Sequence, residues 1–343
     1  MDFHPTEEQA AAAGLAARIF ADLSTHERLA ATGTGSDAEL WKALTTAGLT
    51  AAVQEIGLLG LVLLLEEQGR TTAQVPYAAT CVYGILPVAA HGSPEQRARL
   101  LPALGSGDAV ATGAFPARGR ITARGGRLTG TAPTVPWLRD ATHVLVPDTE
   151  RALWLVRTDA PGVRTSPVET TAPWSAGRLV LSGADAERIG IEGAYEHSLA
   201  AARTAFAGLQ AGVCAGSLAR AVEHTSSREQ FGRPLSTNQA VMLRAADAYM
   251  DTEAIRVTAY EAAWRIDQGL AAHEHALTTA WWASEAGKRV VHAGQHLHGG
   301  MGADLDHPVH RHFLWGRQLD AYLGCGGELL AELGASIAEG ERA

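Results

Sequence analysis

SSREQFGRPLSTNQ, residues 226–239, combines an arginine, a Phe-Gly pair and a glutamine that follows the arginine by eleven positions. Arg228 offers a planar fork for a phosphate, and Phe231 offers an apolar face for a flat ring. The same residues also suit a purely structural role, in which one helix ends at the Phe-Gly pair and the next begins at Thr237 or Asn238. Taken alone, the stretch leaves nucleotide binding and a simple connection between helices both open.

The segment richest in histidine is HLHGGMGADLDHPVHRHF, residues 296–313. Histidine ligands of a metal on one helix stand four residues apart, and zinc sites usually add cysteine or carboxylate at fixed spacing. Here Gly299, Gly300 and Gly302 are expected to break any helix between the two groups of histidines. Adjacent glycines let a backbone come close to a ligand. Three interpretations of this segment therefore stay open: exposed or capping histidines, a loop that approaches a phosphate, and a metal site.

Composition limits the class of protein. The formal net charge is -9, with 46% hydrophobic and 19% charged residues. This indicates a globular chain and argues against a nucleic-acid binder, since such a binder needs a basic face. The three cysteines are too far apart for a CxxC metal pair. The longest apolar run, residues 56–65, is about half of a bilayer span and predicts a buried helix. Because the N-terminus is polar and acidic, we expect a soluble, cytoplasmic protein that does not contact membranes.

Three regions of the chain differ in composition and in the spacing of their apolar residues. Residues 1–108 are rich in Ala and Leu at helical spacing. Residues 109–190 carry short apolar runs bounded by Gly, Pro and Asp, which indicate a small β domain. Residues 191–343 contain two segments that each suit a helix of more than about 25 residues, which is typical of a helical bundle. Local signals inside these regions are helix caps at Ser36 or Asp37 and at Ser93, and a hairpin turn at Gly125 and Gly126.

The two opening stretches together resemble the C-terminal domain of acyl-CoA dehydrogenases. That family carries R-x-x-F-G-x-P-L-x-x-x-Q followed by L-H-G-G-x-G-x-x-x-D-x-P-V-x-R, and both patterns stand here in that order. Three further stretches resemble the family's N-terminal domain: ELWKALTTAGL, EEQGR and HGSPEQRARLLPAL. The resemblance therefore covers nearly the whole chain. It implies the acyl-CoA dehydrogenase fold, which is mainly α: an N-terminal helical domain over 1–108, a small middle β domain over 109–190 and a C-terminal four-helix bundle over 191–343.

The resemblance also implies FAD that is shared across a subunit interface. In the family, the R-x-x-F-G segment and the Q-x-x-G-G loop of one subunit embrace the adenosine-diphosphate part of a flavin that lies mainly in its neighbour. Carried over, Arg228 pairs with the pyrophosphate and Phe231 packs near the nucleotide. The family's loop glutamine falls on His296, which departs from the pattern but can still donate a hydrogen bond. The implied cofactor-binding residues are Arg228, Gln230, Phe231, Gln239, His296, Gly299 and Gly300.

The departures from the family pattern concern the chemistry itself. The family's base is a glutamate that removes the α-proton of an acyl thioester, in surroundings that keep its pKa suitable. At the position that most members use, this chain has Leu323, and at the alternative position, before Arg203, it has Ala202. The stretch ATGAFPARGRITA, residues 111–123, lacks the family's T-E-P-x-x-G-S-D pattern for the flavin ring. We therefore assign no catalytic residue and no metal ligand to this chain.

These departures imply a subunit that works with a partner. The chain resembles the short subunit of actinobacterial heterotetrameric (α2β2) acyl-CoA dehydrogenases, which act on CoA thioesters of steroid side chains in lipid and steroid degradation. The implied reaction is α,β-dehydrogenation of an acyl-CoA thioester. A second acyl-CoA dehydrogenase-like subunit would supply the glutamate and hold the flavin ring, and electron-transfer flavoprotein is the implied electron acceptor.

Two other classes of function stay open at this point. The first is a homomeric acyl-CoA dehydrogenase whose base has moved, for which Glu328, Asp320 and Glu223 are the candidates nearest in sequence. The second is a flavin-free scaffold or binding protein built on a decayed dehydrogenase. A metalloenzyme that uses the histidines is a third and more distant alternative.

Overall fold

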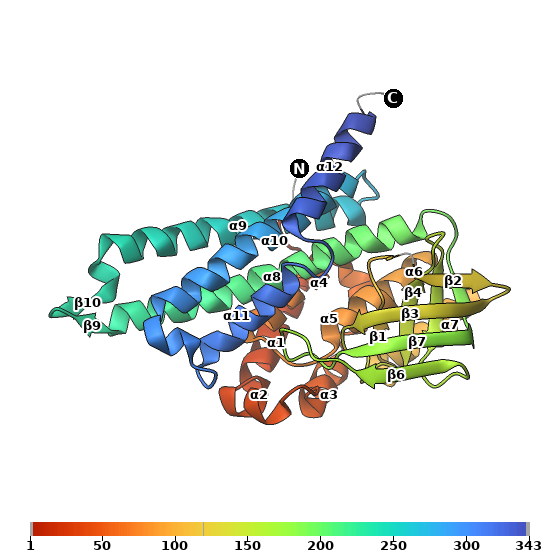
Figure 1. The fold of residues 1–343 in the computed structure, drawn as a ribbon, viewed down its shortest axis with the longest axis horizontal. Helices are drawn as coiled ribbons and strands as arrows, with labels where there is room; N and C mark the ends of the chain where they lie inside the picture. The colour runs from red at the N-terminus through yellow and green to blue at the C-terminus, as the bar shows by residue number, and fades with distance from the viewer. Residues whose placement is uncertain (1–2, 119, 341–343) are drawn as a thin grey trace. The chain divides into compact units, whose positions relative to one another are not determined.

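The structure is a computed structural model that describes residues 3–118 and 120–340. The chain divides into two compact units. We call residues 1–13, 62–73 and 203–343 the bundle unit, and residues 14–61 and 74–202 the sandwich unit. Three of the helices labelled in Figure 1 contribute residues to both units: α1 (Glu7–Leu23), α4 (Val53–Thr71) and α8 (Ala194–Ser227).

The sandwich unit is built around two four-stranded sheets. One has the order β1-β4-β5-β8, in which only β1 and β4 are parallel, and the other has the antiparallel order β2-β3-β7-β6. Leu128 and Leu179 of one sheet share a single buried cluster with Val144 and Val156 of the other, which is how two sheets pack face to face. The strands are β1 (Ala111–Gly113), β2 (Ile121–Arg124), β3 (Arg127–Val135), β4 (His143–Pro147), β5 (Leu153–Arg157), β6 (Val163–Pro167), β7 (Gly177–Asp185) and β8 (Glu187–Ile189).

Short helices complete the sandwich unit, and two of them begin at the predicted caps. Asp37 accepts hydrogen bonds from the first turn of α3, while Ser36 instead donates to Asp140 at 2.7 Å. Ser93 and Gln96 form a reciprocal capping box at the start of α7. The elements are α2 (His26–Thr32), α3 (Ala38–Thr46), α5 (Tyr77–Thr80), the π-helical turn η1 (Cys81–Ile85), α6 (Leu86–His91) and α7 (Pro94–Ser106).

The bundle unit packs its helices at close backbone distance. A Cβ on Gly212 of α8 would overlap the carbonyl oxygen of Glu66 on α4, and a Cβ on Gly294 of α10 would overlap the hydroxyl of Ser217 on α8. Small residues at these positions let long helices approach each other. The elements besides α8 are β9 (Glu229–Gln230), β10 (Arg233–Pro234), the 3₁₀ turn η2 (Leu235–Thr237), α9 (Gln239–Asp267), α10 (His273–Leu297), the 3₁₀ turn η3 (Gly299–Ala303), α11 (Pro308–Leu319) and α12 (Gly326–Gly340).

Helix α8 is long and apolar enough to cross a membrane by length and composition. However, 72% of its most apolar window is buried inside the protein. The core helix of a globular protein has the same composition, since both of its faces meet apolar neighbours. The length of α8 is therefore weak evidence for a membrane span.

Most of the predicted elements are present. The apolar run 56–65 lies in the largely buried α4, the predicted hairpin turn at Gly125 and Gly126 has φ of 57° and 75°, and the two long C-terminal segments form α8 and α9. One alternative interpretation was wrong: α8 ends at Ser227, before the Phe-Gly pair, which forms a turn between strands instead. A mainly α fold with a small β part is confirmed.

Candidate functional site

The segment between α8 and α9 is a tight hairpin that projects Phe231 into solvent. The two residues between β9 and β10, Phe231 and Gly232, have φ of 54° and 74°. Two positive φ values in a two-residue loop are typical of a type I′ turn. A non-glycine residue in this conformation costs about 1–2 kcal/mol, and Phe231 is 100% exposed. Its ring gains no burial in return within the described part of the chain.

Arg228 stands at the base of this hairpin. Its backbone N–H donates to the carbonyl of His224 at 2.8 Å, and its own carbonyl accepts from the N–H of Leu235 at 2.9 Å. Its side chain is exposed and forms no ion pair within the part of the chain that the structure describes. Gln230 lies exposed on β9, and Gln239, also exposed, begins α9. Four of the sequence-predicted residues thus lie exposed between the end of α8 and the first residue of α9, and the guanidinium of Arg228 has no ion-pair partner among the described residues.

The glycine loop after α10 leaves open space above its backbone. His296 is exposed in the last turn of α10, and Gly299 has φ of 62°, which glycine adopts without strain. No described atom lies within 4 Å of a Cβ built on Gly300, whereas a Cβ on Gly302 would overlap the carbonyl oxygen of Gln295. Internal packing therefore explains Gly302 but not Gly300. The glycines end α10 as predicted, although they form a 3₁₀ turn rather than an irregular break.

Stacked imidazole rings join these two motifs at one end of the bundle unit. The ring of His224, one turn before Arg228, stacks on the ring of His298, with centroids 4.8 Å apart and 19° between the planes. His298 is buried, and its Nδ1 donates to the carbonyl of Gly294 at 2.7 Å. The ring of His307 lies 5.0 Å from that of His298. Two motifs far apart in sequence therefore meet through three histidines.

The charges around these imidazoles are mostly positive. Burial lowers the pKa of His224, and the neighbouring His298 and Arg228 lower it further. Burial also lowers the pKa of His307, helped by His298, Arg220 and His224. The rings of His224 and His307 are therefore favoured in their neutral forms. Asp304 opposes this effect at His307, while Glu223 acts on Arg220, whose pKa burial lowers and Glu223 raises.

The remaining histidines have structural roles. His307 caps α11, and its Nδ1 accepts the N–H of Val309 at 3.3 Å. His312 is only 1% exposed, its Nε2 donates to the carbonyl of Arg70 at 2.9 Å, and burial lowers its pKa to about 4. An exposed or capping role therefore fits His296 and His307 but is wrong for His312. Within residues 3–118 and 120–340, no three His, Cys, Asp or Glu side chains are arranged to hold a metal ion.

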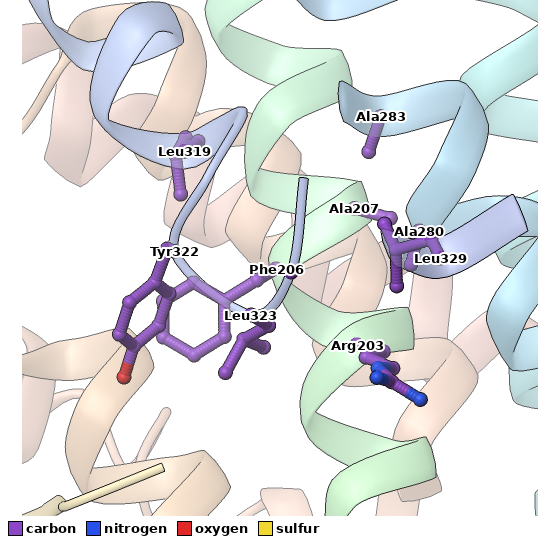
Figure 2. Close-up of a pocket in the computed structure, with 10 residues that line it drawn as sticks. Arg203, Phe206, Ala207, Ala280, Ala283, Leu319, Tyr322, Leu323 and Leu329 are labelled. Carbon is purple, nitrogen blue, oxygen red and sulfur yellow. The ribbon is translucent and has the colours of Figure 1, made fainter. Parts of the chain in front are cut away.

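Leu323 lines a small pocket of the bundle unit (Figure 2). It stands on the loop after α11 beside Tyr322, whose ring meets that of Phe206 on α8 edge to face at 4.9 Å. The cavity volume is about 20 Å³, which is room for roughly one water molecule. None of the described side chains that line it is acidic. The lining residues are Arg203, Phe206, Ala207, Ala280, Ala283, Leu319, Tyr322, Leu323, Gly324 and Leu329.

The one charged group in this lining, Arg203, is already engaged. It is 6% exposed and donates to both carboxylate oxygens of Glu332, at 2.9 and 2.7 Å. Ala202, the preceding residue of α8, is fully buried. The candidates for a displaced base lie outside the lining: Glu328 is exposed and accepts the N–H of Cys325, Glu223 is exposed on α8, and Asp320 is ion-paired with Arg317 at 2.7 Å.

In the sandwich unit, Phe115 of the stretch 111–123 packs against two tyrosine rings from elsewhere in the chain. The ring of Phe115 lies 5.1 Å from that of Tyr83 and stacks on that of Tyr195 at 5.6 Å. All three side chains are buried, and the hydroxyl of Tyr195 accepts the N–H of Ala117 at 3.0 Å. The segment that differs from the family's flavin-contacting pattern therefore contributes Phe115 to a row of three packed rings, Tyr83, Phe115 and Tyr195, which we call the aromatic ladder.

Comparison with known proteins identifies the chain's relatives. Residues 6–108 match the family model of the acyl-CoA dehydrogenase N-terminal domain, and residues 190–337 match that of the C-terminal domain. Acyl-CoA dehydrogenase FadE27 of Mycobacterium tuberculosis is 36% identical, over 99% of both chains. A solved structure of the Tcur3481-Tcur3483 steroid ACAD, G363A variant, is 41% identical with a TM-score of 0.93, over 98% of this chain and 99% of that one. The ChsE4-ChsE5 complex of Mycobacterium tuberculosis is 33% identical with a TM-score of 0.93, over 99% of both chains.

Proposed function

The chain belongs to the acyl-CoA dehydrogenase family, and on that premise we propose that it is a non-catalytic subunit that completes the FAD site of a partner subunit. Acyl-CoA dehydrogenases are FAD-dependent oxidoreductases, and bound FAD accepts the hydride that leaves the acyl thioester. In this proposal, the partner supplies the glutamate and holds the flavin ring. This chain binds the adenosine-diphosphate end and stabilises the assembly.

The observation that carries the proposal is the exposed hairpin. Phe231 is fully exposed in a costly left-handed conformation, and Arg228 beside it has no ion-pair partner among the described residues. A solvent-exposed ring and a free guanidinium suit a flat base and a diphosphate in another subunit. The open space over Gly300 suits the same ligand. Arg228, Gln230, Phe231, Gln239, His296, Gly299 and Gly300 would hold the cofactor.

The pocket at Leu323 supports the non-catalytic part of the proposal. Neither Leu323 nor Ala202 can take a proton, and the lining residues include no carboxylate. A volume of about 20 Å³ also leaves no room for an acyl thioester. The aromatic ladder at Phe115 is consistent with a chain that has given up its own flavin-ring contacts.

The relatives support a partner and a class of substrate. One of them is described as a steroid ACAD and another as a complex of two chains, ChsE4 and ChsE5. We extend both features to this chain: an α2β2 heterotetramer with a second acyl-CoA dehydrogenase-like subunit, acting on the CoA thioester of a steroid side chain. Electron-transfer flavoprotein as the acceptor and a cytoplasmic location belong to the same proposal.

The experiment that tests this proposal is the flavin stoichiometry of the purified protein. The chain is expressed alone and, separately, together with a full-length acyl-CoA dehydrogenase-like partner, and released FAD is measured by absorbance. We expect no flavin on the chain alone and one FAD per pair after co-expression. One FAD per chain without a partner, together with dehydrogenase activity, would instead establish a homomeric enzyme. A stable complex without flavin would establish the scaffold.

A further inference from the structure

The rings of His224, His298 and His307 form a continuous cluster where the hairpin and the glycine loop meet. Successive centroids are 4.8 and 5.0 Å apart. The rings of His224 and His298 are nearly parallel, so their nitrogens do not converge on one point as the ligands of a metal ion do. Metal binding therefore does not explain their arrangement.

The hydrogen bonds of two rings fix where a further proton can go. Nδ1 of His298 donates to the carbonyl of Gly294, so Nε2 is the nitrogen of this ring that the bond leaves available. Nδ1 of His307 accepts the N–H of Val309 at the start of α11, so its Nε2 carries the hydrogen. Protonating His307 would break its helix cap, whereas protonating the stacked pair of His224 and His298 breaks no such bond. The stacked pair is therefore the natural place for proton uptake.

The surroundings favour the neutral forms of His224 and His307 when no ligand is bound. Burial lowers the pKa values of both rings; Arg228, the residue after α8, adds to this effect at His224, and Arg220 on α8 adds to it at His307. The carboxylates are Asp304, beside His307, and Glu223, which acts on Arg220. A bound group with two negative charges would reverse the balance, because an anion close to an imidazole favours the protonated ring.

Resting on the proposed function, we propose that this cluster makes capture of the nucleotide's diphosphate proton-coupled: the stacked pair His224–His298 takes up a proton when the diphosphate binds beside Arg228. His307 acts differently, since it contributes an Nε2–H donor and keeps its cap. The ligand class is a dinucleotide or nucleoside diphosphate, and the protonated pair adds a positive charge only when that ligand is present.

The sign of the pH effect follows directly. If binding takes up a proton, the affinity is highest where the pair is already protonated and falls as the pH rises. One linked proton weakens binding by up to about tenfold per pH unit above the pKa of the free pair. The dissociation constant of FAD from the complex with the partner should therefore rise between pH 6 and pH 8.

The test compares this pH dependence in the wild-type complex and in three variants. In His224→Gln and His298→Gln, we expect a flatter plot of log Kd against pH. In His307→Asn, which keeps an N-cap residue at α11, we expect weaker binding with the wild-type slope. His224→Gln guards against misfolding of His298→Gln, because His298 is buried and His224 is partly exposed. As a second readout, inorganic pyrophosphate added to the full chain should raise the pKa of His224 measured by NMR.

The outcomes separate this inference from the function on which it rests. A complex that binds FAD with the same pH slope in wild type, His224→Gln and His298→Gln would overturn the proton-coupled cluster and leave the shared FAD site intact. A complex that binds no FAD at any pH would overturn both. If the slope flattens only in His307→Asn, the proton is taken up by His307 and not by the stacked pair, which would contradict the inference.

Discussion

The guanidinium of Arg203 holds both carboxylate oxygens of Glu332, at 2.9 and 2.7 Å, and so ties α8 to α12. Arg203 is 6% exposed and the Glu332 side chain 41% exposed. Removing the carboxylate leaves a buried cation without its partner, which costs several kcal/mol for a fully buried pair and less here because solvent screens Glu332. We expect Glu332→Gln to lower the free energy of unfolding by about 1–2 kcal/mol in urea denaturation. Glu328→Gln on the same helix is the control and should change it little.

The exposed carboxylate of Glu328 also tests whether the base has merely moved. It accepts the N–H of Cys325, and it is not among the described residues that line the pocket at Leu323. Loss of a general base typically lowers turnover by 10²–10⁴-fold. In the complex with the partner, we expect Glu328→Gln to keep kcat within about twofold of wild type, far from that range. A loss of 100-fold or more would point to a homomeric mechanism with Glu328 as base.

Close packing of α8 against α4 predicts a large effect of one methyl group. A Cβ on Gly212 would overlap the backbone of Glu66, which cannot move aside as a flexible side chain can. We expect Gly212→Ala to destabilise the protein by about 3 kcal/mol or more, as overpacked cores do. Gly334→Ala in α12 is the matched control: nothing lies within 4 Å of its Cβ, so the better helix former should stabilise by about 0.5–1 kcal/mol. Equal melting temperatures for the two variants would contradict this packing.

The buried His312 predicts a pH dependence of stability. Its pKa is about 4 in the folded protein and near 6.5 in an unfolded chain. The unfolded state therefore binds a proton that the folded state does not, so stability is present above about pH 6.5 and is lost as the pH falls toward 4. The full effect is about 3 kcal/mol. Urea denaturation at pH 4.5 and pH 7 should show a smaller loss in His312→Gln than in wild type, and parallel losses would show that His312 is not the group responsible.

The hairpin predicts opposite effects of one substitution on stability and on cofactor binding. Phe231→Gly removes a side chain that is fully exposed and relieves a left-handed non-glycine residue, so the isolated chain should gain up to about 1 kcal/mol. The complex, however, should retain less FAD, because the ring would no longer pack on the nucleotide. Arg228→Ala should lower FAD retention without that gain. Arg178→Ala, an exposed arginine on β7, is the control, and unchanged flavin in both hairpin variants would remove the hairpin from the site.

Local signals were enough for most secondary structure. The caps at Asp37 and Ser93 and the hairpin at Gly125 depend on hydrogen bonds and φ values within a few residues, and all three occur as predicted. The strands β1, β6 and β8 are not among the short apolar runs that indicated a β domain over 109–190. They are three to five residues long and depend on partners elsewhere in the sheets, so no local pattern marks them.

The sequence by itself determined the family, the order of helical and β regions, and the absence of an acidic residue at both expected base positions, because these depend on residue identity and spacing alone. Only the tertiary structure decided which side chains meet. The ring of His224 stacks on that of His298, Arg203 bonds to Glu332, and Phe231 is fully exposed. Each of these features depends on where residues far apart in the chain lie in space. Such contacts follow from how the helices pack, and no periodicity in a single stretch of sequence encodes them.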